Sequence, residues 1–98
     1  MTVVESVENA AGPEFQIAAL RQRGIVALSE REIEVLLAWF ASDSKEGAAR
    51  LMFISPATVA THIARVRGKY AGAGRSARTK TALFARFLED GYTSLWDW

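Results

Sequence analysis

The sequence predicts an all-α fold of four helices that form a helix-turn-helix domain, preceded by an N-terminal extension or linker. Three observations support this prediction. Apolar residues recur at helical spacing along most of the chain. Strong helix-capping sequences stand at Ser29 and at Ser55-Pro56. Between them lies a shorter helical segment followed by a tight turn, and this order is typical of a helix-turn-helix unit.

Composition limits the function classes. The chain has 98 residues, half of them apolar, which is enough for one domain with a small core. Cysteine is absent, and the single histidine, His62, disfavours a zinc site or a histidine-based catalytic pair. No apolar stretch is long enough to span a bilayer, and Met1 to Gly12 lacks signal-peptide character. We therefore expect a cytoplasmic protein that is no enzyme and has no catalytic residue, metal, cofactor or membrane partner.

Charge is segregated along the chain although its net value is only +1. Residues 1–44 carry seven carboxylates against three arginines, and residues 45–88 carry nine lysines and arginines against Glu46 alone. Residues 89–98 add three carboxylates and no cation. Segregated charge attracts a polyanion to one face of a protein. On charge alone, a solvated basic surface without a partner explains the pattern equally well.

The first part of the chain, residues 1–27, is predicted to be a linker or N-terminal arm. Residues 1–13 show little periodicity and end in Gly12-Pro13, while residues 14–22 are expected to form a short helix or an extended arm that ends at Gly24. The first helix of the domain begins at Ser29, which forms a capping box with Glu32. Its buried residues are expected to be Val35, Leu36, Trp39 and Phe40.

The second helix is predicted from about Lys45 to Met52, with Ser44 as its cap. Ala48 and Ala49 allow a close approach of two helices, whereas Gly47 costs about 1 kcal/mol relative to alanine. A tight turn at residues 53–54 follows.

The third helix is predicted over residues 56–70, with Ser55 as its cap and Pro56 in the first helical position. Its inner face is expected to carry Val59, Ile63, Val66 and Tyr70, and its outer face Thr61, Ala64, Arg65 and Gly68. Gly68 is expected to loosen the last turn. A flexible basic loop over residues 71–76 then leads to a fourth helix at about 79–90, which Gly91 ends.

Several motifs in order carry a family resemblance. Leu28 to Leu36, with the sequence LSEREIEVL, resembles the opening of the LuxR/NarL-type helix-turn-helix domain of bacterial transcription regulators. Ile54 to His62 resembles the most specific part of that family, I-S-x-x-T-V-x-x-H, and Arg78-Thr79 resembles the start of its fourth helix. The resemblance covers about residues 28–91, which we take as the domain, and leaves residues 92–98 as an aromatic tail.

The resemblance implies a sequence-specific DNA-binding transcription regulator. Its helix 56–70 would lie in the major groove of double-stranded DNA, and helix 45–52 would cross the backbone. The predicted DNA-binding residues are Ser55, Thr58, Ala60, Thr61, Ala64, Arg65, Arg67, Lys69 and Arg78.

Within this set the expected roles differ. The resemblance places Ala60, Thr61 and Ala64 near base edges, but an alanine cannot form a hydrogen bond with a base. Thr61, Arg65 and DNA shape are therefore expected to carry most of the specificity. We expect Arg67 and Lys69 to contact the flanking backbone and Thr58 to contact phosphate or to stay structural. Arg75, Arg78 and Lys80 either reach phosphates from the loop or are simply solvated, and His62 has a positioning role.

The resemblance also implies a homodimer on DNA, formed by the fourth helix. The predicted dimer residues are Leu83, Phe84, Phe87 and Leu88, and the aromatic tail either covers this face or extends the interface. Family members commonly form the output end of response regulators in two-component systems, so a receiver domain N-terminal to this chain and RNA polymerase are expected partners. Since 27 residues are too few for a receiver domain, the chain is a fragment or a free-standing regulator, and its linker-like start favours the fragment.

A protein-interaction module is the alternative. In that case the same fold would dock through Phe84, Phe87, Trp96 and Trp98, with DNA binding lost through Ala60 and Ala64.

Overall fold

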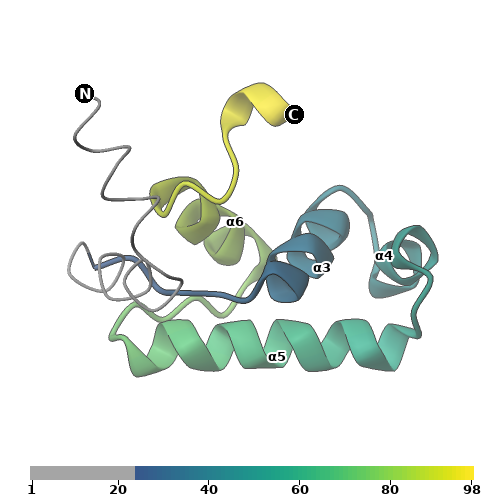
Figure 1. Ribbon diagram of the computed structural model, residues 1–98, viewed down its shortest axis with the longest axis horizontal. Helices are drawn as coiled ribbons and strands as arrows, with labels where there is room; N and C mark the ends of the chain where they lie inside the picture. The colour runs from purple at the N-terminus through teal and green to yellow at the C-terminus, as the bar shows by residue number, and fades with distance from the viewer. Residues whose placement is uncertain (1–23) are drawn as a thin grey trace, which may run out of the picture.

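Four α-helices and one short 3-10 helix make up the computed structural model, which describes residues 24–98 (Figure 1). They are α3 (Glu30–Phe40), α4 (Lys45–Met52), α5 (Pro56–Gly72), α6 (Lys80–Glu89) and η1 (Leu95–Asp97). No strand occurs in this part of the chain, so the prediction of an all-α, four-helix fold is confirmed. The expectations for residues 1–23, an arm or a short helix, lie outside the described residues.

The longest helix, α5, lies along one side of the molecule, and the other three helices all lie on its opposite side (Figure 1). α3 and α4 pack against α5 and against each other, with α4 at the N-terminal end of α5. α6 lies above the C-terminal half of α5 (Figure 1). One face of α5 is therefore left without a covering helix. None of the described helices is long and apolar enough to cross a membrane.

A serine or threonine side chain caps the N-terminus of each α-helix, as predicted for the first three, while Thr79, expected to begin the fourth helix, is its cap. Each cap oxygen accepts a backbone N–H three residues on, at 3.0 to 3.1 Å. The caps are Ser29, Ser44, Ser55 and Thr79. The predicted capping box is also present, because the backbone N–H of Ser29 donates to Oε1 of Glu32 at 2.8 Å. These helix starts follow from contacts within four residues of sequence.

The ends of two helices depend on left-handed backbone. α4 ends at Phe53, whose φ of 57° turns the chain toward α5, and Ile54 N–H then bonds the carbonyl of Ala49 at 3.0 Å. Gly91, with φ of 78°, ends the α6 region as predicted. The structure corrects the end of α5, which continues to Gly72 rather than to residue 70. Gly68 does not interrupt the helix, and the chain leaves it only at Gly74, where φ is 74°.

The glycine inside α4 has a packing reason that the sequence did not show. A Cβ on Gly47 would lie 3.1 Å from Cβ of Ser42. Ser42 is itself fixed at the end of α3, where its hydroxyl donates to the carbonyl of Ala38 at 2.7 Å. The glycine therefore allows the chain to turn tightly from α3 into α4.

The core draws on all four helices and on the segments that flank them. The buried apolar residues are Val26, Val35, Leu36, Trp39, Ala48, Ala49, Val59, Ile63, Val66, Tyr70, Ala77, Leu83 and Phe87. Phe40, expected to be buried, is half-buried and packs edge-on against Phe84 and Phe87. Val26 and Tyr92 fall outside the expected domain of 28–91, yet both belong to the packed structure. The Tyr92 hydroxyl donates to the Val26 carbonyl at 2.5 Å, and the Tyr92 ring packs on Phe87.

Candidate nucleic-acid interface

The uncovered face of α5 carries small side chains and one arginine. Val59, Ile63, Val66 and Tyr70 are fully buried on the inner face, as predicted. On the outer face, Thr61, Ala64, Arg65 and Gly68 are exposed, also as predicted. The sequence of α5 contains no aspartate or glutamate. This face, which points away from the other helices, is thus free of negative side chains (Figure 1).

Most hydroxyl groups on this face already have a partner inside the helix. The Thr61 hydroxyl donates to the carbonyl of Ala57 at 3.0 Å. The Thr58 hydroxyl lies 2.9 Å from Oγ of Ser55, which also caps the helix by accepting from the Thr58 N–H. Among the outward residues of α5, Arg65 has no hydrogen bond or ion pair with any other residue in the described part of the chain.

Arg67 and Lys69, predicted to contact the DNA backbone, both make contacts with α3 in this structure. The Arg67 guanidinium lies 6.0 Å from the centre of the Trp39 ring, and its Nε is buried. The Lys69 ammonium lies 2.6 Å from Oε1 of Glu32. Both residues lie on the flanks of α5, where α3 crosses it, and a linear charge pattern does not show which cations meet such a neighbour.

Arg75 and Lys80, considered as phosphate contacts from the loop, also make internal contacts. Arg75 binds both oxygens of Asp90, at 2.8 and 3.0 Å, and its Nη1 donates to the carbonyl of Gly24 at 2.9 Å. Lys80 donates to the carbonyl of Ser42 at 2.5 Å and lies over the Trp39 ring, 5.2 Å from its centre. These side chains are therefore not simply solvated, and a phosphate contact, the other explanation that the sequence left open, stays a prediction.

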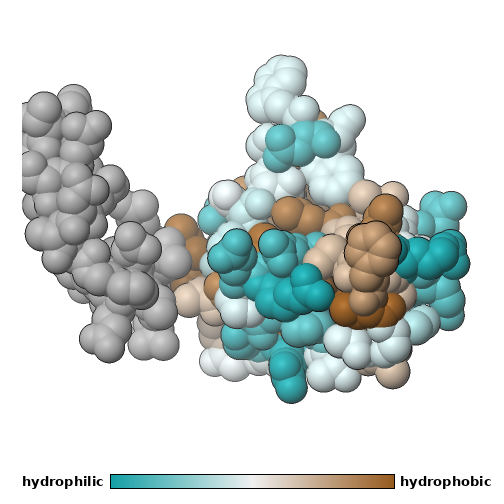
Figure 2. All heavy atoms as spheres, turned by 45° about the vertical axis from the view of Figure 1, so that its right-hand side comes forward, coloured by the Kyte–Doolittle hydropathy of each residue, from teal (hydrophilic) through white to brown (hydrophobic). Residues whose placement is uncertain are grey.

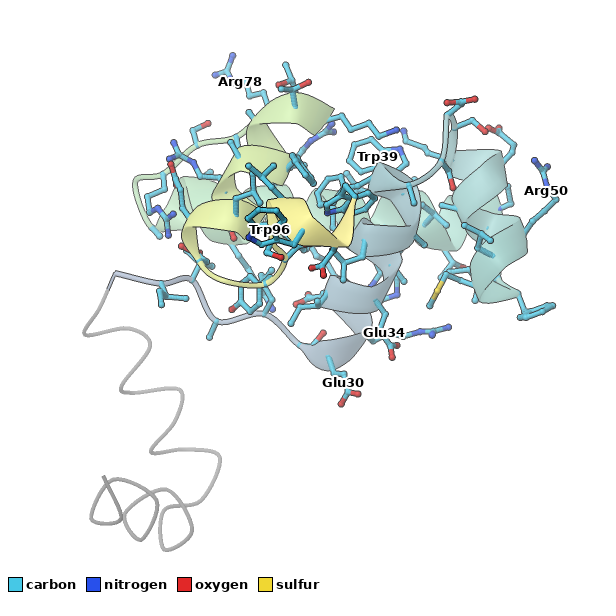
Figure 3. The ribbon with its side chains drawn as sticks, turned by 90° about the horizontal axis from the view of Figure 1, so that it is seen from above. Glu30, Glu34, Trp39, Arg50, Arg78 and Trp96 are labelled. Carbon is cyan, nitrogen blue, oxygen red and sulfur yellow. The ribbon has the colours of Figure 1, made fainter. Side chains whose placement is uncertain are left out.

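Four exposed cations make no side-chain hydrogen bond or ion pair within residues 24–98. They are Lys45 and Arg50 on α4, Arg65 on α5, and Arg78 before α6. Figure 3 shows Arg50 and Arg78 extending outward from the body, while Glu30 and Glu34 lie on the other side of the molecule from Arg78. These four side chains can meet an anion without first breaking a contact inside the protein.

A cluster around Asp90 was not anticipated from the sequence. The buried Asp90 carboxylate accepts from the Tyr70 hydroxyl at 3.1 Å and from the Val26 N–H at 3.2 Å, in addition to its pair with Arg75. Burial, and then the negative charge of Asp90, raise the pKa of the Tyr70 hydroxyl. The hydrogen bond to Asp90 raises the pKa of Arg75. This cluster ties residues 24–26 to the C-terminal ends of α5 and α6.

Glu32 forms a second internal charge site. Burial alone would raise its pKa, but the hydrogen bonds from Lys69 and Ser29 outweigh burial and lower the pKa below its ordinary value. Glu32 therefore stays ionised at neutral pH, at the start of α3, where a negative charge is favourable. The half-buried ring of His62 has an Nδ1 atom that is buried without a hydrogen-bond partner among the described residues.

The predicted dimer residues of α6 divide into two pairs. Leu83 and Phe87 are fully buried in the core, so their side chains present no surface to a second copy. Phe84 and Leu88 are half-buried and still reach the surface. The ring of Trp98 packs edge-on against Phe84 at 5.4 Å, so part of this surface is covered by the tail.

Large apolar side chains are exposed in two places. Phe53 is 94% exposed in the turn between α4 and α5, beside Leu51 at 59%. Figure 2, which brings this end of the molecule forward, shows an apolar patch between hydrophilic areas. In the tail, Trp96 is 96% exposed and Leu95 70%. The tail was considered from the sequence as a docking surface, whereas the exposure of Leu51 and Phe53 was not anticipated, because a helical pattern does not show which flanking apolar residues lack a partner.

The comparison with known protein families finds a match over the helix-turn-helix region. The model of the bacterial regulatory proteins of the luxR family matches residues 26–79, which include α3, α4 and α5. No curated protein and no solved structure matches the chain. Since the matched residues are more than half of the chain, the protein belongs to the luxR family of bacterial regulatory proteins. The predicted family is confirmed, and with it the general function of a DNA-binding transcription regulator.

Proposed function

We propose that this luxR-family domain is a sequence-specific transcription regulator that places α5 in the major groove of double-stranded DNA. The observation that carries the proposal is the outward face of α5, which is uncovered, free of acidic residues and made of small side chains around Arg65. An α-helix fits the major groove of B-form DNA, and small side chains permit a close approach to base edges.

The unpaired cations support contacts with the DNA backbone. Lys45 and Arg50 extend from α4, which lies beside the N-terminal end of α5. In helix-turn-helix complexes the helix before the recognition helix crosses the backbone at this place. Ser55 and Thr58 are exposed at the start of α5, where backbone N–H groups favour a phosphate. Arg78 supplies a further positive charge beyond the C-terminal end of α5.

We also propose that two copies bind together on DNA through the exposed parts of α6. Phe84 and Leu88 are the predicted dimer residues that still reach the surface. Because Trp98 packs on Phe84 in the single chain, the dimer is expected to be weak in solution and to form on two half-sites. In this proposal the chain is the output domain of a response regulator, with a receiver domain N-terminal to it and RNA polymerase as its effector.

The test is a selection of bound duplexes from a random pool at near-physiological salt. The expected product is an inverted repeat whose half-sites lie about one helical turn apart. Arg65→Ala should lose the enriched sequence. Arg31→Ala is the matched control, because Arg31 is exposed on α3 and pairs with Glu34 at 3.4 Å, and this variant should select the same repeat. Enrichment that is equal for wild type and Arg65→Ala would contradict the proposed role of α5 in base recognition.

One observation favours the protein-interaction alternative. Trp96 and Leu95 are exposed in the tail, and exposed aromatic side chains are frequent at protein interfaces. Phe87, however, is buried and cannot take part, and Phe84 is partly covered. If the selection enriches no sequence and the binding of duplex DNA shows no salt dependence, the result would favour the protein-interaction alternative over DNA binding.

A further inference from the structure

The outward face of α5 has very few hydrogen-bond donors left for a base. The Thr61 proton is used on the carbonyl of Ala57, and the Thr58 and Ser55 hydroxyls face each other at 2.9 Å. Ala57 and Ala64 have no donor, and Gly68 has no side chain. Arg65 remains as the one long donor side chain on this face that has no partner in residues 24–98.

Apart from Arg65, this face presents methyl groups. They belong to Ala57, Thr61 and Ala64, which are three and four residues apart and therefore share one side of the helix. Because the hydroxyl of the exposed Thr61 is already bonded to the Ala57 carbonyl, its methyl group is the part of this side chain that is left for a new contact. In the major groove, thymine is the base that presents a methyl group, and alanine and threonine methyl groups are its usual contacts.

The length of this surface limits the number of base pairs it can meet. Ala57 and Ala64 are seven residues apart, which corresponds to about 10 Å along a helix. That length matches about three base pairs of B-form DNA. Beyond Ala64, the position of Gly68 is open, because nothing lies within 4 Å of the place where a Cβ would be. Since glycine has no side chain there, the helix backbone can come close to the DNA.

We propose that α5 recognises each half-site through a single guanine, contacted by Arg65, next to about three base pairs whose thymine methyl groups contact Ala57, Thr61 and Ala64. This inference rests on the proposed insertion of α5 into the major groove. It names the chemistry of the operator: guanine N7 and O6 accept from the guanidinium, and the remaining contacts are apolar. A recognition helix with several free donors would instead select a run of distinct hydrogen-bonding patterns.

The test uses the duplex that the random pool selection yields, in matched synthetic versions. In one series each thymine is replaced singly by uracil, which removes only the C5 methyl group. In a second series each guanine is replaced by 7-deazaguanine, which removes the N7 acceptor. We expect each contacted thymine to cost about fourfold in Kd, the value of one buried methyl group. The contacted guanine should cost about tenfold or more.

Two protein variants assign each effect to its side chain. Thr61→Ser keeps the hydroxyl that bonds Ala57 and removes only the methyl group. In this variant one thymine position should lose its sensitivity to uracil, while the other positions keep theirs. In Arg65→Ala, 7-deazaguanine should have no further effect. Unfolding curves of both variants, matched to wild type, show whether a loss of affinity comes from a loss of fold.

The outcomes separate this inference from the function on which it rests. If the chain selects a duplex and binds uracil and thymine versions equally, methyl recognition is wrong and DNA shape carries the specificity, although the proposed function stands. If Thr61→Ser leaves the uracil pattern unchanged, the assignment to Thr61 is wrong. If no duplex of any sequence is bound, the proposed function and this inference both fail.

Discussion

The charged residues of the cluster around Asp90 are paired and at least partly buried, whereas the arginine on the outward face of α5 is unpaired and exposed. In the cluster, the Asp90 carboxylate binds the Arg75 guanidinium and the Tyr70 hydroxyl, and it is almost completely buried. On the outward face, Arg65 extends into solvent without a partner in the described structure. Both arginines belong to the same basic stretch of sequence. A basic stretch of sequence therefore contains cations of two kinds, those that stabilise the fold through internal contacts and those that remain free for a ligand.

The substitution expected to reduce stability most removes the carboxylate at the centre of the Asp90 cluster. Asp90→Ala removes the acceptor of the buried Tyr70 hydroxyl and the ion pair of Arg75, which keeps only the Gly24 carbonyl and the exposed Glu89, and we expect the unfolding free energy to fall by about 3 kcal/mol. Urea unfolding, followed by tryptophan fluorescence, measures it. Glu89→Gln is the matched control because Glu89 is half exposed, and it should cost less than about 0.5 kcal/mol. A similar loss of unfolding free energy in both variants would contradict the prediction that the buried Asp90 carboxylate contributes more to stability than the exposed Glu89 carboxylate.

The next prediction compares two arginines of α5 that lie two residues apart. Arg65→Ala should weaken operator binding by about tenfold or more, with unfolding free energy unchanged, because the exposed side chain has no hydrogen bond or ion pair within residues 24–98. Arg67→Ala should lower unfolding free energy by about 1 kcal/mol through its lost contact with Trp39. Fluorescence anisotropy with labelled duplex and urea unfolding measure the two quantities. A lower salt slope in Arg67→Ala would instead make Arg67 a phosphate contact.

A pH experiment sharpens the comparison at Glu32. Because the folded pKa of Glu32 lies below its ordinary value of 4.5, its ionised form stabilises the fold above that pH. This contribution is lost as the pH falls through the folded pKa. Glu32→Gln should therefore lower unfolding free energy by about 1 kcal/mol at pH 7, and the difference from wild type should shrink below about pH 4.5. Glutamine retains the acceptor for the Ser29 N–H, so the loss reports the Lys69 pair. If the difference in unfolding free energy between wild type and Glu32→Gln stays constant with pH, the ion pair of Glu32 with Lys69 is not its cause.

The last prediction concerns the aromatic tail, where Trp96→Ala is expected to have the smallest effect of all these variants. Trp98 packs on Phe84, so Trp98→Ala should cost about 1 kcal/mol of unfolding free energy and uncover that part of α6. Trp96→Ala should change unfolding free energy by less than about 0.5 kcal/mol, since Trp96 is almost fully exposed. Sedimentation equilibrium then measures dimer formation. We expect stronger association for Trp98→Ala, and weaker association in that variant would make the tail part of the interface.

Much of the fold could be predicted because its signals are local. Each predicted cap bonds an N–H three residues on, and the four residues of the inner face of α5 recur at helical spacing. The family resemblance then predicted the order of the helices. The sequence predicted less well which residues of the site are free to bind DNA, because these residues were selected by sequence position and charge. Thr61, Ala64 and Arg65 lie on the free face, whereas Arg67 and Lys69 bind α3.

The remaining features depend on contacts between distant residues. Arg75 and Asp90 are 15 residues apart, Lys69 and Glu32 are 37 apart, and Tyr92 and Val26 are 66 apart. Leu83 and Phe87 also could not be assigned from the sequence, because apolar residues suit either a dimer face or the core. The packing of α6 shows that both are buried in the core.

Three properties could therefore be predicted from the sequence alone: where the helices begin, which residues of α5 face inward and to which family the chain belongs. Periodicity and caps act within one or two helical turns, so they are visible in a linear string. Which cations of the described residues are free, and which apolar residues of α6 reach the surface, became clear only from the packing of the helices. These properties depend on which side chains meet across the core, and a free cation differs from a paired one only in what lies next to it.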